Sequence, residues 1–195
     1  MFLYTELKLA YRRYWSSNTP YASANGGSYN FVLEKDKGKA IPVEQRFWDD
    51  LLENSTKWGL INYEQDWLCT EFDGLNVTLQ SPTVARQWLL QMGQAAAEND
   101  LTIQYCMAYA RHILQSVEVQ AVTNFRASGD YQAGNDQWKL GLSSILANAL
   151  ALAPSKDNYW TTTTQPGSAS LPPRDAVFWV FDFFLPFMIS LLCQF

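Results

Sequence analysis

Two short segments carry most of the information in this chain: residues 63–67, Tyr-Glu-Gln-Asp-Trp, and residues 125–131, Phe-Arg-Ala-Ser-Gly-Asp-Tyr. Each follows a strand-like run, Gly59 to Asn62 in the first case and Val119 to Asn124 in the second. Each also contains an aspartate beside an aromatic residue. An acid at the C-terminal end of a strand is where a β/α barrel presents its catalytic groups, and two such acids are the minimum for cleaving a glycosidic bond.

The rest of the chain alternates helical and strand patterns. Apolar periodicity predicts helices over 43–58, 81–100 and 138–153, a short helix or loop over 110–116, and strands over 60–63, 101–107, 119–125 and 158–162. Ser81 followed by Pro82 is a favourable start for the helix over 81–100. Gly59 is expected to end the helix over 43–58. Residues 71–80 are expected to form a loop. Strands that alternate with helices predict an α/β fold with a parallel sheet.

Two architectures share this pattern, a doubly wound sheet and a β/α barrel. No Gly-x-Gly-x-x-Gly motif or phosphate-binding loop follows any strand, so the nucleotide-binding doubly wound folds lose their main support. Acids at successive strand ends favour the barrel. A complete barrel needs about 250 residues, and the segments 3–9 and 11–15 would add at most two strands. We therefore predict a partial TIM-type (β/α)8 barrel.

Composition excludes several function classes. The net charge of −5 disfavours a nucleic-acid partner, and a single histidine, His112, leaves no multi-histidine zinc site. The three cysteines, Cys69, Cys106 and Cys193, have no metal-ligand spacing. We expect no metal and no other cofactor, and we expect His112 to be structural. The 8 Trp, 10 Tyr and 11 Phe indicate a large aromatic core, with a sugar-stacking cleft as the alternative.

The domain prediction has three parts: a barrel-type domain over 1–165, a Pro/Gly/Ser-rich linker over 166–175, and an apolar tail over 176–195. The tail is long enough to span a membrane, but Asp182 and Pro186 count against a span. We expect a non-native or alternatively spliced C-terminus, with membrane contact as the alternative. No signal peptide is visible, and the compartment stays open between secreted, lysosomal and cytoplasmic.

The second segment resembles a known enzyme family. The resemblance is to raffinose synthases and alkaline α-galactosidases. Their Cys-Met strand is similar to Cys106-Met107. Their Arg-Ala-Ser-Asp-Asp-Phe motif is similar to the segment that follows after a gap, Arg126-Ala127-Ser128-Gly129-Asp130-Tyr131. The Arg-x-x-x-Asp spacing also matches the wider α-galactosidase clan. The resemblance covers roughly residues 40 to 165.

The resemblance implies roles for individual residues. Asp66 would be the nucleophile and Asp130 the acid/base, Arg126 would contact the sugar, and Cys106 would line the pocket. Further substrate-binding candidates are Trp67, Glu64 and Asp157. The family usually has Lys-x-Asp around its nucleophile, whereas this chain has Glu64-Gln65-Asp66, an acid in place of a cation.

The expected function is therefore hydrolysis of α-linked sugars through two aspartates, with a retaining mechanism and a carbohydrate substrate. The alternative from another class is a catalytically inactive carbohydrate-binding barrel fragment, which would keep the aromatic residues and would not need paired acids. The distance between the carboxylates of Asp66 and Asp130 separates the two, because a retaining pair lies about 5–5.5 Å apart and an inverting pair about 6.5–9.5 Å apart.

Overall fold

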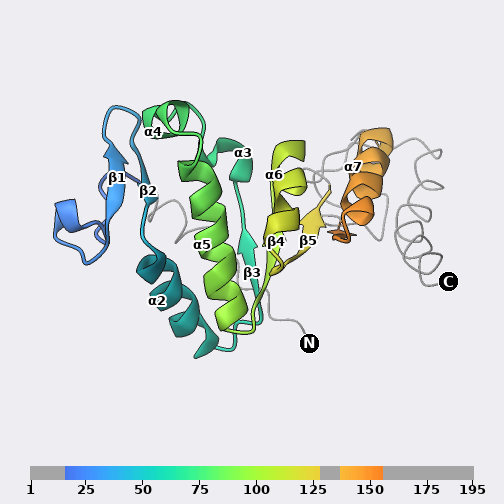
Figure 1. The fold of residues 1–195 in the computed structure, drawn as a ribbon, viewed down its shortest axis with the longest axis horizontal. Helices are drawn as coiled ribbons and strands as arrows, with labels where there is room; N and C mark the ends of the chain where they lie inside the picture. The colour runs from blue at the N-terminus through green and yellow to red at the C-terminus, as the bar shows by residue number, and fades with distance from the viewer. Residues whose placement is uncertain (1–15, 128–136, 156–195) are drawn as a thin grey trace, which may run out of the picture. The chain divides into compact units, whose positions relative to one another are not determined.

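Figure 1 shows the computed structural model of the chain, which describes residues 16–127 and 137–155. The chain divides into two compact units, Met1–Thr123 and Asn124–Phe195, and each unit is described by itself. Several predicted segments lie outside the described residues: the strands at 3–9, 11–15 and 158–162, the linker at 166–175 and the tail at 176–195.

The first unit starts with a short 3-10 turn and a hairpin and continues with alternating helices and strands. In chain order its elements are η1 (Ser23–Asn25), β1 (Phe31–Glu34), β2 (Lys39–Pro42), α2 (Gln45–Thr56), β3 (Asn62–Gln65), α3 (Leu68–Glu71), α4 (Asn76–Gln80), α5 (Val84–Glu98), β4 (Thr102–Tyr105), α6 (Ala110–Gln115) and η2 (Ser116–Glu118). Strand β5 (Val122–Arg126) crosses into the second unit, which also holds α7 (Gln137–Ala149) and β6 (Ala153–Ser155).

The main sheet has four strands in the order β3-β4-β5-β6. Strand β3 pairs in parallel with β4, with Glu64 opposite Gln104, and β5 pairs in parallel with β6, with Phe125 opposite Pro154. The predicted α/β fold with a parallel sheet is thus confirmed. Strands that are neighbours in sequence are neighbours in the sheet, so its described part lacks the order reversal that marks a doubly wound sheet. Four strands do not make a barrel, so the TIM-type barrel stays a prediction.

A cluster of aromatic residues forms the core on one face of β3. Helices α2 and α5 run side by side there (Figure 1). Trp48 of α2 is fully buried and meets Tyr63 of β3 and Trp88 of α5 edge to face, with ring centroids 6.4 and 5.2 Å apart. Phe47 and Phe72 extend the cluster. Such pairs contribute about 0.5–1.5 kcal/mol each beyond the burial of their area, so these aromatic residues serve the core.

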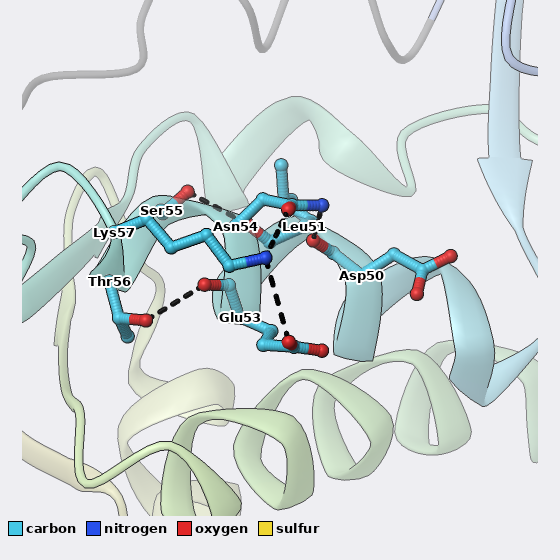
Figure 2. A network of polar contacts seen from close by, with 7 residues as sticks. All are labelled: Asp50, Leu51, Glu53, Asn54, Ser55, Thr56 and Lys57. Atoms are coloured by element: carbon cyan, nitrogen blue, oxygen red, sulfur yellow. Dashed lines mark hydrogen bonds and ion pairs between the residues drawn. The ribbon is translucent and has the colours of Figure 1, made fainter.

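Helix α2 ends through bonds between its own residues (Figure 2). The side-chain amide of Asn54 donates to the carbonyl of Asp50 at 2.7 Å. Lys57 Nζ lies 3.0 Å from Asn54 Oδ1 and 3.6 Å from the carboxylate of Glu53, and a cation at this end of a helix is favourable. Gly59 then adopts a positive φ of 86°, so the predicted stop is confirmed.

An unpredicted hairpin precedes α2. Strands β1 and β2 pair antiparallel from Phe31 opposite Pro42 to Glu34 opposite Lys39. Gly38, in the turn, has a φ of 67°, a conformation that favours glycine.

The hairpin also explains a wrong prediction, the loop at 71–80, which contains the last residue of α3 and the whole of α4. The carboxylate of Glu34 accepts the backbone N–H groups of Asn76 and Val77, both at 2.9 Å. These are two of the donors that the first turn of a helix leaves without an internal partner. The acid that begins α4 comes from a distant strand, so the local sequence pattern does not reveal the helix.

Two further boundaries differ from the prediction. Helix α5 does not start at Ser81, which instead follows the last residue of α4. The helix predicted over 138–153 ends at Ala149, and its last predicted residue belongs to β6. Ala151 turns the chain with a φ of 59°, and because it is not a glycine, the usual sequence signal for a helix end is missing.

Candidate active site

Asp66 lies where the sequence predicts it, directly after the last residue of β3. Its side chain is 3 % exposed, and its Oδ1 accepts the backbone N–H of Trp67 at 2.8 Å. Trp67 has a φ of 60°, an uncommon conformation for a residue with a side chain. The turn therefore orients the carboxylate and fixes it at the C-terminal edge of the sheet.

Three of the predicted site residues come together at this edge. One carboxylate oxygen of Glu64, one of Asp66 and the Sγ of Cys106 all lie within 4.8 Å of one another. Asp66 and Cys106 are buried and Glu64 is half-buried. We call these three residues the acid–thiol cluster.

Strand geometry explains the convergence. Side chains two residues apart on a strand point to the same face. Glu64 and Asp66 therefore lie on one face of the sheet, and Tyr63 and Gln65 lie on the other. The parallel register places Gln65 opposite Tyr105, which brings the next residues along each strand, Asp66 and Cys106, side by side. The acid–thiol cluster thus lies on the side of the sheet away from Trp48 and Trp88.

Backbone hydrogen bonds hold the two strand ends together. The N–H of Cys106 donates to the carbonyl of Gln65 at 3.0 Å, and the N–H of Leu68 donates to the carbonyl of Cys106 at 3.4 Å. One residue further on, the N–H of Cys69 donates to the carbonyl of Met107 at 2.8 Å. The one-turn helix α3 is therefore anchored on the end of β4, which limits movement of Asp66 relative to Cys106.

Gln65 supports the site from behind, a role that the sequence analysis did not assign. It is fully buried, its Oε1 accepts the hydroxyl of Tyr63 at 3.0 Å, and its Nε2 donates to the backbone carbonyl of Asp66 at 2.9 Å. A buried amide whose groups are bonded in this way makes the backbone of Asp66 rigid. The signal available in the sequence was a polar residue two positions after Tyr63, on the strand face that Tyr63 gives to the core.

The other predicted site residues lie beside the acid–thiol cluster, in the second unit or outside the described residues. Trp67 is half-buried and bonds to Asp66 through its backbone N–H. Arg126 ends β5, in the second unit, and is 6 % exposed. Asp130 and Asp157 lie outside the described residues, so the distance between the two proposed catalytic aspartates stays open.

His112 and Glu71 are among the titratable groups whose pKa values are shifted. Burial, with a smaller contribution from the cation of Arg111, lowers the pKa of His112 to about 4, and its Nδ1 accepts the backbone N–H of Tyr109 at 3.0 Å. The imidazole is 3 % exposed, which agrees with the predicted structural role. Burial raises the pKa of Glu71, in α3, well above its usual value. The sequence gives no sign of this carboxyl group, because acids on short helices are usually solvated.

Comparison of the chain with protein-family models, with curated proteins and with solved structures finds no match. Among the described residues, no helix combines the length and the apolar character that a membrane crossing requires. Inferences about function therefore depend on the geometry of the site and on the sequence motifs.

Proposed function

We propose that this chain is a glycoside hydrolase-like protein with a β/α-barrel architecture, which acts on α-linked sugars through Asp66 and Asp130. The observation that carries the proposal is the position of Asp66, a buried carboxylate at the C-terminal end of a parallel strand. Enzymes with barrels of this kind place their catalytic groups at that edge. The sequential strand order β3-β4-β5-β6 supports the architecture, because right-handed connections between successive strands put all helices on one face.

The proposed reaction has two displacements. In the first, a carboxylate oxygen of Asp66 attacks the anomeric carbon, the glycosidic C–O bond breaks, and Asp130 gives its proton to the departing oxygen. In the second, Asp130 takes a proton from water, the water oxygen attacks the anomeric carbon, and Asp66 is released. Transfer to a second sugar is the same chemistry with a hydroxyl group in place of water.

The supporting residues have separate tasks. Trp67 N–H and the bonded amide of Gln65 hold Asp66 in one orientation, and such positioning makes attack effectively intramolecular. Arg126 is proposed to donate hydrogen bonds to sugar hydroxyls, the indole of Trp67 to contact the sugar, and Cys106 to line the pocket.

The test is turnover of aryl α-galactosides and α-glucosides by the full chain and by Asp66→Asn. This substitution keeps the size and hydrogen-bonding shape of the side chain and removes the nucleophile, so we expect a loss in kcat on the order of 10⁴-fold. Asp73→Asn is the matched control, because Asp73 is an exposed acid beyond α3. Equal turnover by the wild type and Asp66→Asn would refute the assignment.

The replacement of the expected lysine by Glu64 favours a second candidate, a carbohydrate-binding protein without catalysis. This candidate predicts saturable binding of sugars by the wild type, measured by calorimetry, with no release of the aryl group. Turnover that depends on Asp66 would exclude it.

A further inference from the structure

The acid–thiol cluster holds two donors, Glu64 and Cys106, that take no part in the bond cleavage of the proposed glycosidase reaction. A retaining glycosidase needs one carboxylate as nucleophile and a second as acid/base, and it needs neither a thiol nor a further acid beside the nucleophile. Here an oxygen of Glu64, an oxygen of Asp66 and the Sγ of Cys106 lie within 4.8 Å of one another. Two of the three residues are almost fully removed from solvent, Asp66 at 3 % and Cys106 at 0 % exposure. A buried thiol that converges with two carboxylates offers a cation three different ligands at one point.

We propose that Glu64, Asp66 and Cys106 bind a divalent cation of the zinc type. Around a tetrahedral zinc ion, with bonds of about 2.0–2.3 Å, neighbouring oxygen and sulfur ligands stand about 3.3–3.8 Å apart. Because no two of the ligand atoms are more than 4.8 Å apart, the acid–thiol cluster has to contract by at most about 1.5 Å to reach that spacing. Glu64 is the half-buried member with the longest side chain, and it can supply this movement by a change of rotamer.

The donor types select the ion. Thiolate ligands favour Zn²⁺ and similar ions, whereas Mg²⁺ and Ca²⁺ prefer sites made of oxygen alone. Three protein ligands leave a fourth position for water, as in zinc sites that are not purely structural. A cation between two carboxylates also offsets their mutual repulsion, which is strong where water is largely excluded.

The strand ends make the site largely preformed. The hydrogen bonds that join Cys106 to Gln65 and Leu68 fix the separation of the thiol from Asp66 before any ion arrives. Binding therefore needs little ordering of the chain. The cation site does not depend on the proposed function, but if both are correct, a bound ion occupies the nucleophile Asp66 and inhibits sugar cleavage.

The experiment uses Co²⁺ and Zn²⁺ as probes on the reduced full chain. We expect Co²⁺ to produce a thiolate-to-cobalt charge-transfer band that saturates at a single equivalent, and Zn²⁺ to displace it while Mg²⁺ does not. The three cysteines of the chain allow a matched design. A Cys69→Ser/Cys193→Ser variant keeps Cys106 alone and should keep the band, whereas Cys106→Ala, with the other two thiols intact, should lose it.

Glu64→Gln keeps the proposal testable if Cys106→Ala does not fold, because residue 64 is half-buried and glutamine has the same shape. We expect this variant to bind Zn²⁺ at least about tenfold more weakly in calorimetry, with an unchanged circular dichroism spectrum. The proposal is overturned if the wild type gives no cobalt band, if the band survives in Cys106→Ala, or if Glu64→Gln binds Zn²⁺ as tightly as the wild type. None of these readouts depends on sugar turnover, so failure here and failure of the proposed function are distinct results.

Discussion

Acidification should destabilise this protein through one residue, His112. Burial lowers the pKa of this imidazole from 6.5 to about 4. The environment explains why a second charge is disfavoured: Phe72 and Tyr109 lie 6.4 and 6.1 Å away between ring centroids, and the cation of Arg111 is adjacent. Protonation would also place a hydrogen on Nδ1, which accepts the N–H of Tyr109 at 3.0 Å, so this bond at the start of α6 would be lost.

The size of the effect follows from linkage. A folded-state pKa below the unfolded-state value means that the unfolded chain takes up the proton more readily. The contribution of the neutral His112 imidazole to the free energy of unfolding is therefore fully present above pH 6.5 and is lost as the pH falls toward 4. A difference of about 2.5 pKa units at about 1.4 kcal/mol per unit gives at most about 3 kcal/mol, of which about 2 kcal/mol is lost by pH 5.

The assay compares urea unfolding of the wild type and His112→Asn between pH 7.5 and 4.5. Carboxyl groups contribute equally to both proteins, so the difference between their free energies of unfolding isolates the imidazole, and it should shrink as the pH falls. Because His112 is the single histidine of the chain, its NMR titration can also be assigned without ambiguity. A pKa near 6.5 in the folded protein, or a difference between the two proteins that does not change with pH, would refute the reasoning.

The remaining predictions concern other buried positions. Burial raises the pKa of Glu71, so its contribution to stability is present below pH 4.5, the ordinary pKa of a glutamate, and is lost as the pH rises. Glu71→Gln should remove that loss, measured as the fall of the urea midpoint from pH 4.5 upward, and an equal fall in both proteins would contradict it. Gly93→Ala should destabilise by about 1–3 kcal/mol because the added Cβ would lie 2.1 Å from Cγ1 of Val119. Its control, Gly141→Ala, meets open space within α7 and should stabilise by roughly 0.5–1 kcal/mol, measured by thermal unfolding; a stabilised Gly93→Ala would show that Val119 moves aside freely.

Local patterns predicted the central elements of the fold correctly and failed where distant residues decide. The sequence predicts β3, β4, β5 and α2 to within a few residues. Apolar periodicity and the helix stop at Gly59 are properties of the local sequence, so no distant residue is needed to find them. Helix α4 was missed because its first N–H groups bond to Glu34 of a separate hairpin. The end of α7 was misplaced because Ala151, and not a glycine, makes the turn.

The candidate site also depends partly on local sequence and partly on distant residues. The sequence identified Asp66 at a strand end, and it determined that Glu64 lies on the same face, because alternate residues of a strand point to the same side. The family resemblance assigns Cys106 to the same pocket as these acids, but the spacing of the cysteines gives no metal-ligand pattern, and the sequence therefore predicts no metal. Only the tertiary structure puts the thiol of Cys106 within ligand distance of both carboxylates, because the register between β3 and β4 is set by long-range pairing and by helices packing on the opposite face. The identities of the three side chains are local information, whereas their meeting within 4.8 Å is a property of the folded sheet.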